Sequence, residues 1–173
     1  MSAPKPEFSR PVAADKVGRD GMTLDIAASP AERAALARRF GLLGLAKLEA
    51  RCRLRPVAGG MIELACRFAA AATQECVVTL APVEAAIEQS FQLRYALDPK
   101  LLAAGPEEEI DLEADDPPEA LEHGAIDLGE AVAQHLALAL DPYPRAPGAA
   151  FASAGADSAA NPFAILNRLK GKS

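Results

Sequence analysis

The sequence has 173 residues and a formal net charge of −6, and half of its residues are hydrophobic, with alanine common among them. This length allows one domain of ordinary size, whose core is built from Leu, Ile, Val and a few Phe because Trp is absent. No segment approaches the ~18 uncharged apolar residues of a transmembrane helix, and the N-terminus lacks the apolar run of a signal peptide, so the sequence predicts a cytoplasmic protein without a membrane partner.

A short strand and a helix come first along the chain. Residues 22–26 alternate between apolar and polar side chains, which is typical of a strand. The segment Ser29-Pro-Ala-Glu32 combines three helix-start signals: a hydroxyl cap, a first-turn proline and the glutamate of a capping box. We predict a helix from this point that ends at one of the next two glycines, Gly41 or Gly44.

A hairpin follows the helix. Apolar and charged residues alternate over residues 46–55, with Ala46 in the apolar set, and alternate again over residues 61–68. The glycine-rich residues 56–60 between them predict the turn. If Arg55 lies opposite Met61, opposite charges face one another across the hairpin. The pairs that this register predicts are Arg53 with Glu63 and Glu49 with Arg67.

The sequence has three cysteines, Cys52, Cys66 and Cys76. The assumed register places Cys52 opposite Leu64 and Cys66 opposite Ala50, all on the apolar phase. Their number and spacing match no disulfide framework, and a reducing compartment would keep them as thiols. We therefore expect three reduced core residues.

Two more strands and a long loop are predicted next. Residues 76–80 alternate and should continue as a strand. Residues 82–97 predict another strand, because the alternation persists to the end of this segment, although some of its apolar spacing also suits a helix. Residues 98–122 contain ten carboxylates and one lysine, which indicates a solvated loop, with residues 109–112 as a short edge strand within it.

A second helix and a tail complete the chain. Asp127-Leu-Gly-Glu130 repeats the capping pattern, and the apolar stripe that follows stops before Asp141 and Pro142. Residues 142–160 lack large apolar side chains and predict a flexible linker. Residues 162–170 predict a short amphipathic helix that needs a surface on which to form. We expect one domain over residues 1–141 and a flexible tail over residues 142–173.

The sequence lacks the groupings that catalysis or cofactor binding requires. Its only histidines, His123 and His135, are predicted in the acidic loop and inside the second helix. The adjacent Gly59 and Gly60 belong to the hairpin turn, so no glycine-rich phosphate loop is present. The cysteines lack the spacing of zinc ligands. We expect no enzyme, no cofactor, no metal and no small-molecule substrate.

Charge is distributed unevenly along the chain. Residues 1–60 carry a net charge of +5, residues 61–141 carry −14 and residues 142–173 carry +3. The basic residues of the first predicted helix and of residues 46–55 suit phosphate binding, or alternatively form a solvated face paired with carboxylates. The candidate RNA-binding residues are Arg33, Arg38, Arg39, Lys47, Arg51, Arg53 and Arg55.

Two other segments suit a protein partner. Seven carboxylates occupy ten positions over residues 107–116, which favours a cationic partner over RNA, with a solvated loop as the alternative. Large apolar residues at i, i+3 spacing near the C-terminus suit docking on a partner, with a frayed terminus as the alternative. The candidate partner-binding residues are Glu107, Glu108, Glu109, Asp111, Phe163, Leu166 and Leu169.

Three segments carry a family resemblance: residues 73–83 (TQECVVTLAPV), the acidic stretch, and residues 126–144, which run from IDLGE to DPYP. In order and spacing they resemble the YceD family of bacterial ribosomal-RNA accumulation proteins, over about residues 8–150. Family members commonly carry Cys-x-x-Cys before the Leu-x-Pro; here Thr73 stands in place of the first cysteine and only Cys76 remains. Without that cysteine, the resemblance supports no inference about metal binding.

The resemblance implies a non-enzymatic accessory factor in large-subunit biogenesis that supports 23S rRNA accumulation or processing. Its partner would be a 23S rRNA precursor or a ribosomal protein. The alternatives are a chaperone-like adaptor that binds a basic ribosomal protein through the acidic segment, and a remnant metal-binding module. The expected fold is α+β: an antiparallel sheet of about five to seven strands covered by two α-helices, followed by a flexible C-terminal tail.

Overall fold

The structure is a computed structural model that describes residues 6–98, 117–121 and 123–150. The described elements are β1 (Pro11–Ala13), the 3₁₀ helix η1 (Ala14–Lys16), β2 (Met22–Ala27), α1 (Pro30–Phe40), β3 (Gly44–Val57), β4 (Met61–Glu75), β5 (Pro82–Ala96), β6 (Glu119–Ala120), β7 (Ala125–Asp127) and α2 (Leu128–Ala139). Together they form the α+β fold that the sequence predicts, and no described helix is long and apolar enough to cross a membrane.

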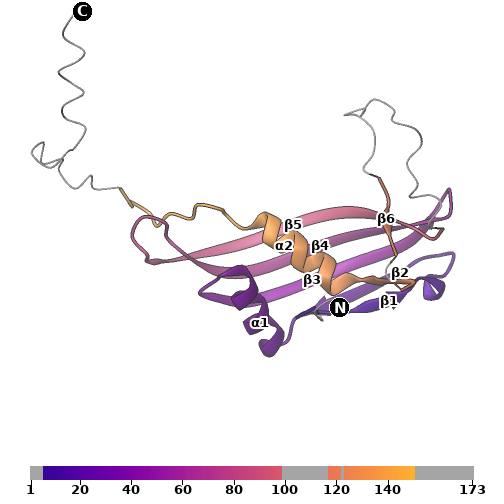
Figure 1. Cartoon of the computed structure of the whole chain (residues 1–173), viewed down its shortest axis with the longest axis horizontal. Coiled ribbons are helices and arrows are strands. Elements are labelled where there is room, and N and C mark those ends of the chain that lie inside the picture. Colours follow the sequence, from indigo (N-terminus) through magenta and orange to yellow (C-terminus); the bar gives the residue numbers. More distant parts are fainter. Residues whose placement is uncertain (1–5, 99–116, 122, 151–173) are drawn as a thin grey trace, which may run out of the picture.

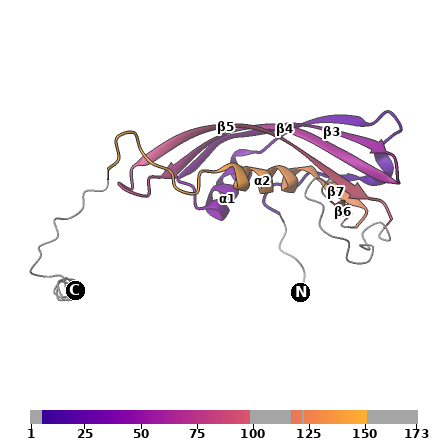
Figure 2. The same ribbon diagram turned by 90° about the horizontal axis from the view of Figure 1, so that it is seen from above.

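The strands form one large sheet and one small one. The large sheet has the order β2-β3-β4-β5-β6, and β1 pairs with β7 in a two-stranded sheet. All neighbours in the large sheet are antiparallel except β6, which runs parallel to the end of β5. Both α-helices lie on the same side of the large sheet, and no described element covers its other side (Figures 1 and 2). We call these two sides the covered face and the open face.

Helix α1 begins and ends as predicted. The Ser29 hydroxyl accepts a hydrogen bond from the backbone N–H of Glu32, and the Glu32 carboxylate accepts one from the N–H of Ser29, which completes the capping box. Gly41 closes the helix with φ of 65°, a left-handed conformation that glycine adopts without strain. Leu36 points into the core and is fully buried.

The β3–β4 hairpin is shifted by two residues from the predicted register. Val57 lies opposite Met61, because β3 continues through Pro56 and the turn is confined to the last three of the five residues assigned to it. Gly59 and Gly60 supply the positive φ values that so short a turn needs, 80° and 71°. The predicted strands are confirmed, and the predicted pairing is wrong.

The shift also corrects the prediction for two cysteines. Cys52 lies directly opposite Cys66, with 4.1 Å between their Cα atoms, and the two form a disulfide. The expectation of reduced thiols is therefore wrong for this pair. It was based on the number and spacing of the cysteines and on a reducing compartment, and the predicted register had placed Leu64, not Cys66, opposite Cys52. Cys76 is a free, buried cysteine, as predicted.

Two further predictions in this region are wrong. A bulge between Leu45 and Lys47 reverses the alternation at the start of β3, so Ala46 is exposed and Leu45 is buried. Residues 76–80 form a turn instead of a strand: the N–H of Leu80 donates to the carbonyl of Cys76 at 2.9 Å, and Leu80 has φ of 61°. The following strand over Pro82–Ala96 is confirmed.

Helix α2 packs across the covered face beside β4 and β5 (Figure 2). Asp127 caps it, since its carboxylate accepts hydrogen bonds from the N–H groups of Gly129 and Glu130 at 3.0 and 3.2 Å. The predicted helix is confirmed. Its buried side includes His135, whose ring stacks on Phe91 of β5 with 3.6 Å between ring centroids. His135 thus has a packing role.

Residues 142–150 follow α2 and contact the β4–β5 turn. The N–H of Val77 donates to the carbonyl of Pro144 at 2.9 Å, and the Cys76 thiol accepts a hydrogen bond from the N–H of Ala146 at 3.3 Å. The predicted domain boundary at residue 141 stays a prediction. The strand expected over residues 109–112 and the helix expected over residues 162–170 lie outside the described residues.

Candidate functional site

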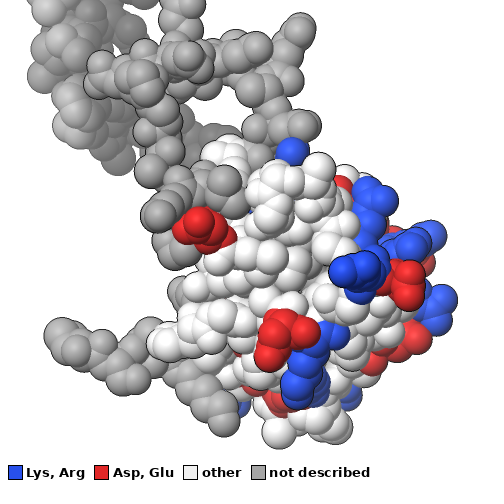
Figure 3. All heavy atoms as spheres, turned by 90° about the vertical axis from the view of Figure 1, so that its right-hand side faces the viewer, with Lys and Arg blue, Asp and Glu red and all other residues white. Residues whose placement is uncertain are grey.

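The open face collects polar side chains from four neighbouring strands. Because side chains alternate between the two faces of a sheet, every second residue of each strand points to this face. Its charged members among the described residues are Asp25 of β2; Lys47, Glu49, Arg51, Arg53 and Arg55 of β3; Glu63, Arg67 and Glu75 of β4; and Glu84, Glu88 and Arg94 of β5. In Figure 3, basic and acidic side chains lie beside one another along the right-hand flank, where this face is seen from its edge.

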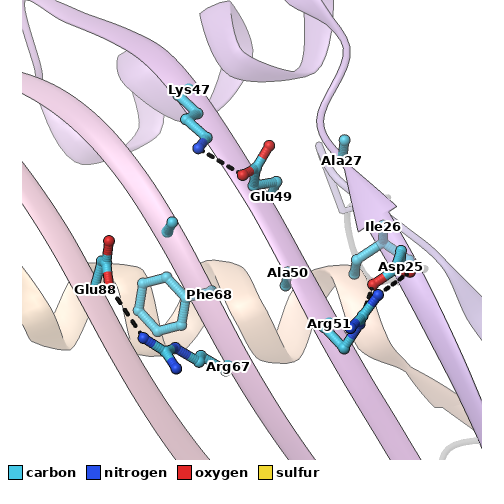
Figure 4. A pocket seen from close by; sticks show the side chains of 11 residues that line it. Asp25, Ile26, Ala27, Lys47, Glu49, Ala50, Arg51, Arg67, Phe68 and Glu88 are labelled. Atoms are coloured by element: carbon cyan, nitrogen blue, oxygen red, sulfur yellow. Dashed lines mark hydrogen bonds and ion pairs between the residues drawn. The ribbon is translucent and has the colours of Figure 1, made fainter.

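Most of the basic residues on this face are held by carboxylates. Arg51 binds Asp25 through two hydrogen bonds, of 2.7 and 2.9 Å. Arg55 binds Glu63 at 2.7 Å. Arg67 binds Glu88 at 3.2 Å, and Lys47 pairs with Glu49 (Figure 4). The hydrogen bond from Arg51 lowers the pKa of Asp25, so this pair is fully charged at neutral pH.

Arg53 differs from its neighbours on β3, because it forms no ion pair with any described residue. It lines a shallow groove of the open face together with Arg51 and Arg67. The rest of the lining consists of the neutral hydrogen-bonding residues Thr23, Ser90 and Gln92 and of Ala65, Cys66 and Phe91. Guanidinium groups and neutral donors around a solvent-filled groove are the groups that hold phosphate oxygens.

A second groove adjoins the first. Arg51 and Arg67 belong to the linings of both, so these two side chains form the ridge between them. The second groove also contains Lys47, Glu49 and Glu88 (Figure 4). Its charges are therefore mixed, and the first groove is the more cationic of the two.

The structure divides the seven predicted RNA-binding residues into two groups. Lys47, Arg51, Arg53 and Arg55 share the open face. The other three, Arg33, Arg38 and Arg39, lie on α1, which packs on the covered side (Figure 2).

Two of the three arginines of α1, Arg33 and Arg39, contact other parts of the fold. Arg39 binds Glu130 of α2 at 2.8 Å and Glu7 at 3.0 Å, which raises the pKa of Arg39 and joins the two helices. Arg33 donates to the carbonyl of Ala28 at 2.7 Å. Arg38 is exposed on α1. None of the three adjoins the open face.

Sequence reasoning missed the contributions of β2, β4 and β5 to the grooves. Only the strand order and register show that Arg67 lies opposite Arg51 and that Gln92 belongs to the same groove. The predicted partner-binding residues, Glu107, Glu108, Glu109, Asp111, Phe163, Leu166 and Leu169, lie outside the described residues.

A third groove lies at the other side of the sheet, near the start of α2. Its lining includes Tyr95, Glu119, His123 and Asp127. Burial raises the pKa of Tyr95, and the neighbouring Glu119 raises it further. Among the described residues, no group of three His, Cys, Asp or Glu side chains is arranged to hold a metal ion.

These features define a class: an α+β protein that packs its helices on one sheet face and presents charged grooves on the other. A sequence model of one family, described as large ribosomal RNA subunit accumulation protein YceD, matches residues 64–170. The chain belongs to this family, as the resemblance of its motifs predicted. Comparisons with curated proteins and with solved structures found no match.

Proposed function

We propose that this chain is a non-enzymatic accessory factor of large-subunit biogenesis that supports the accumulation or processing of 23S rRNA, and that its open face contacts the RNA precursor. The family description, which names accumulation of large-subunit ribosomal RNA, supports the general role. The observation that carries the contact is the groove lined by Arg51, Arg53 and Arg67. Such a factor acts in the cytoplasm, where bacterial ribosomal subunits are assembled.

The ion pairs of the open face are compatible with RNA binding. The side chains of Arg51 and Asp25 are 71 % and 66 % exposed, and those of Arg67 and Glu88 are similarly exposed. Exposed ion pairs contribute little to stability, so an arginine can exchange its carboxylate for a phosphate at small cost. Arg53 has no described carboxylate to exchange and should make the strongest contact with a phosphate.

The carboxylates of the open face compete with RNA phosphates for the arginines and so lower the affinity for RNA. Asp25 holds one edge of the Arg51 guanidinium, through Nε and Nη2, which leaves fewer donors for a phosphate. Removing the Asp25 charge without changing its shape releases Arg51. Loss of Arg53 should therefore weaken RNA binding, whereas neutralisation of Asp25 should strengthen it. Opposite effects at two sites of one face distinguish a specific contact by this face from RNA binding at another surface.

The experiment measures binding of the full chain to a 23S rRNA precursor fragment over a range of salt concentrations. Arg53→Ala should weaken binding and lower the slope of log K against log salt by about 0.7–0.9, the value of one phosphate contact. Asp25→Asn should strengthen binding. Arg145→Ala is the matched control, because Arg145 is exposed in the segment after α2 and away from the open face.

An equal slope for Arg53→Ala and the unchanged chain would contradict RNA contact by this face. Retained RNA binding with no response to either open-face variant would assign the contact to another surface. Capture of a basic ribosomal protein in place of RNA, lost when Glu107, Glu108 and Glu109 are changed to Gln, would favour the adaptor function.

A further inference from the structure

The two edges of the large sheet differ in how well they are protected. At one edge, β2 is six residues long, and Arg10 reaches over its end to donate to the carbonyl of Ala27 at 3.2 Å. At the other edge, β5 is fifteen residues long, and β6 pairs only with Tyr95 and Ala96. No described strand pairs with the remainder of the outer edge of β5.

The outer edge of β5 has free backbone groups at regular intervals. The N–H of Leu97 donates to Gly60 at the end of β4, at 3.1 Å, so odd-numbered positions of β5 direct their backbone groups toward β4. The register between β4 and β5 has no bulge, and the even-numbered positions therefore direct theirs outward. Between Ala86 and Gln92 these are four residues whose N–H and carbonyl groups pair with no strand of the described part of the chain.

Most of the devices that usually prevent edge pairing are absent from residues 83–93, in which Glu84 and Glu88 are the charged residues. Natural sheets protect their edges with charged side chains, lysines above all, and with prolines, bulges or very short strands. Residues 83–93 contain no lysine and no proline, and their pairing with β4 is regular. A long, regular edge of this kind is a template for another strand.

We propose that β5 pairs with β5 of a second copy of this chain, antiparallel and centred on Gln89, so that two five-stranded sheets join into one. In this register residue numbers of paired positions add to 178, and backbone pairing covers residues 86–92 of each copy. Both helix layers then lie on the same side of the joined sheet, and both open faces on the other.

The side chains of β5 complement themselves in this register and in no adjacent one. Backbone pairing ends at residue 92, because β6 occupies the outer edge of β5 at Tyr95 and Ala96. Beyond that point, the long side chains of Glu84 of one copy and Arg94 of the other project from the same face of the joined sheet, twice by symmetry, and their opposite charges attract the two strands. A guanidinium has five donors, so Arg94 can bind this carboxylate in addition to its contacts within its own chain. A shift of one pair in one direction places Glu88 opposite Glu88, and a shift in the other places Gln89 opposite Phe91.

The covered side of the strand agrees with the same register. Ile87 and Phe91, both half-buried, lie opposite one another between copies. Gln89 interrupts this apolar phase and is exposed, although it lies opposite the buried Phe68 of β4. At the two-fold axis, the two Gln89 carboxamides face each other and can exchange one donor and one acceptor.

Cysteine cross-linking of the full chain tests the register. Gln89→Cys places two thiols directly opposite each other at a closely spaced pair, where a disulfide can form. Gln92→Cys is the matched control, because its two thiols would lie about 20 Å apart along the strands. We expect a covalent dimer on mild oxidation of Gln89→Cys, and little from Gln92→Cys. Equal cross-linking at both positions would overturn the proposal.

Charge exchange tests the same pairing by sedimentation analysis. Glu84→Arg alone and Arg94→Glu alone each replace two attractive contacts by two repulsive ones, and each should weaken association by about tenfold or more. A mixture of the two variants restores both contacts and should associate again. The proposal is wrong if the unchanged chain is monomeric up to about 1 mM, or if it dimerises with no response to Glu84→Arg.

Discussion

The covered face of the large sheet is largely buried and apolar, whereas its open face is exposed and charged, although the same strands form both faces. On the covered face, Leu54, Leu64 and Phe68 are buried in the hydrophobic core. On the open face, charged residues predominate, and most of them form ion pairs at the surface. Stability should therefore depend on the covered face, and the open face is free to serve recognition. Adjacent residues of one strand allow this difference to be measured.

The largest effect is expected from Phe68→Ala. Phe68 is 2 % exposed in the middle of β4, and truncation of a buried phenylalanine leaves a cavity that costs about 3–5 kcal/mol of unfolding free energy. Arg67→Ala is the matched control, since Arg67 is the preceding residue and points to the open face. Urea denaturation followed by circular dichroism should show a large shift for the first variant and almost none for the second. Similar shifts for both would contradict the division between the faces.

The disulfide should have the next largest effect. Cys52 and Cys66 close a loop with a sequence separation of 14 residues, and a cross-link of that length stabilises a fold by about 2–3 kcal/mol through the unfolded chain. Reduction of the intact protein should lower its urea midpoint accordingly. The double variant Cys52→Ala/Cys66→Ala should not respond to reductant, which separates this bond from other effects of the reagent. An unchanged midpoint in the reduced protein would show that the bond does not contribute.

Glu32→Gln should lower the free energy of unfolding by about 1 kcal/mol, because it weakens the contact between α1 and the N-terminal segment. Arg10 binds Glu32 through two hydrogen bonds and so lowers the pKa of Glu32 from 4.5 to about 2. The value is moderate because both side chains are partly exposed.

The pH dependence of that variant has a defined sign. Because the pKa of Glu32 is lower in the folded state, its contribution is complete above about pH 4.5 and is lost as the pH falls toward 2. The stability difference between the unchanged chain and Glu32→Gln should therefore shrink over this range, as measured by urea midpoints at several pH values. A difference that stays constant down to pH 2 would show that the charge of Glu32 is not the cause.

Local signals in the sequence predicted the helices and most strands correctly. The capping box at Ser29 and the cap at Asp127 are complete within four residues of chain, so no tertiary information is needed to recognise them. The alternation over β5 is equally local. By contrast, β1, β6 and β7 are two or three residues long and have no periodicity from which a strand could be predicted.

Pairing and position could not be predicted in the same way. The register of the β3–β4 hairpin depends on which residues form the turn, and a two-residue error separated Cys52 from Cys66. The candidate site could be predicted only in part for the same reason. The alternation of β3 identified Arg51 and Arg53, but only the order of the strands in the sheet shows that Arg67 and Gln92 line the same groove. The arginines of α1 were grouped with β3 because they are near it in sequence, although the helix packs on the other side.

The smallest effect is expected from Asp25→Asn, and it completes the comparison between the faces. Asp25 pairs with Arg51 at short distances, as Glu32 does with Arg10, but both side chains are mostly exposed and solvent and salt screen their attraction. The urea midpoint at neutral pH should therefore not change measurably, in low or high salt. Glu32→Gln serves as the positive control under the same conditions. If Asp25→Asn lowered the midpoint as much as Glu32→Gln, the ion pairs of the open face would be part of what holds the sheet together, and their exchange for phosphates would be costly.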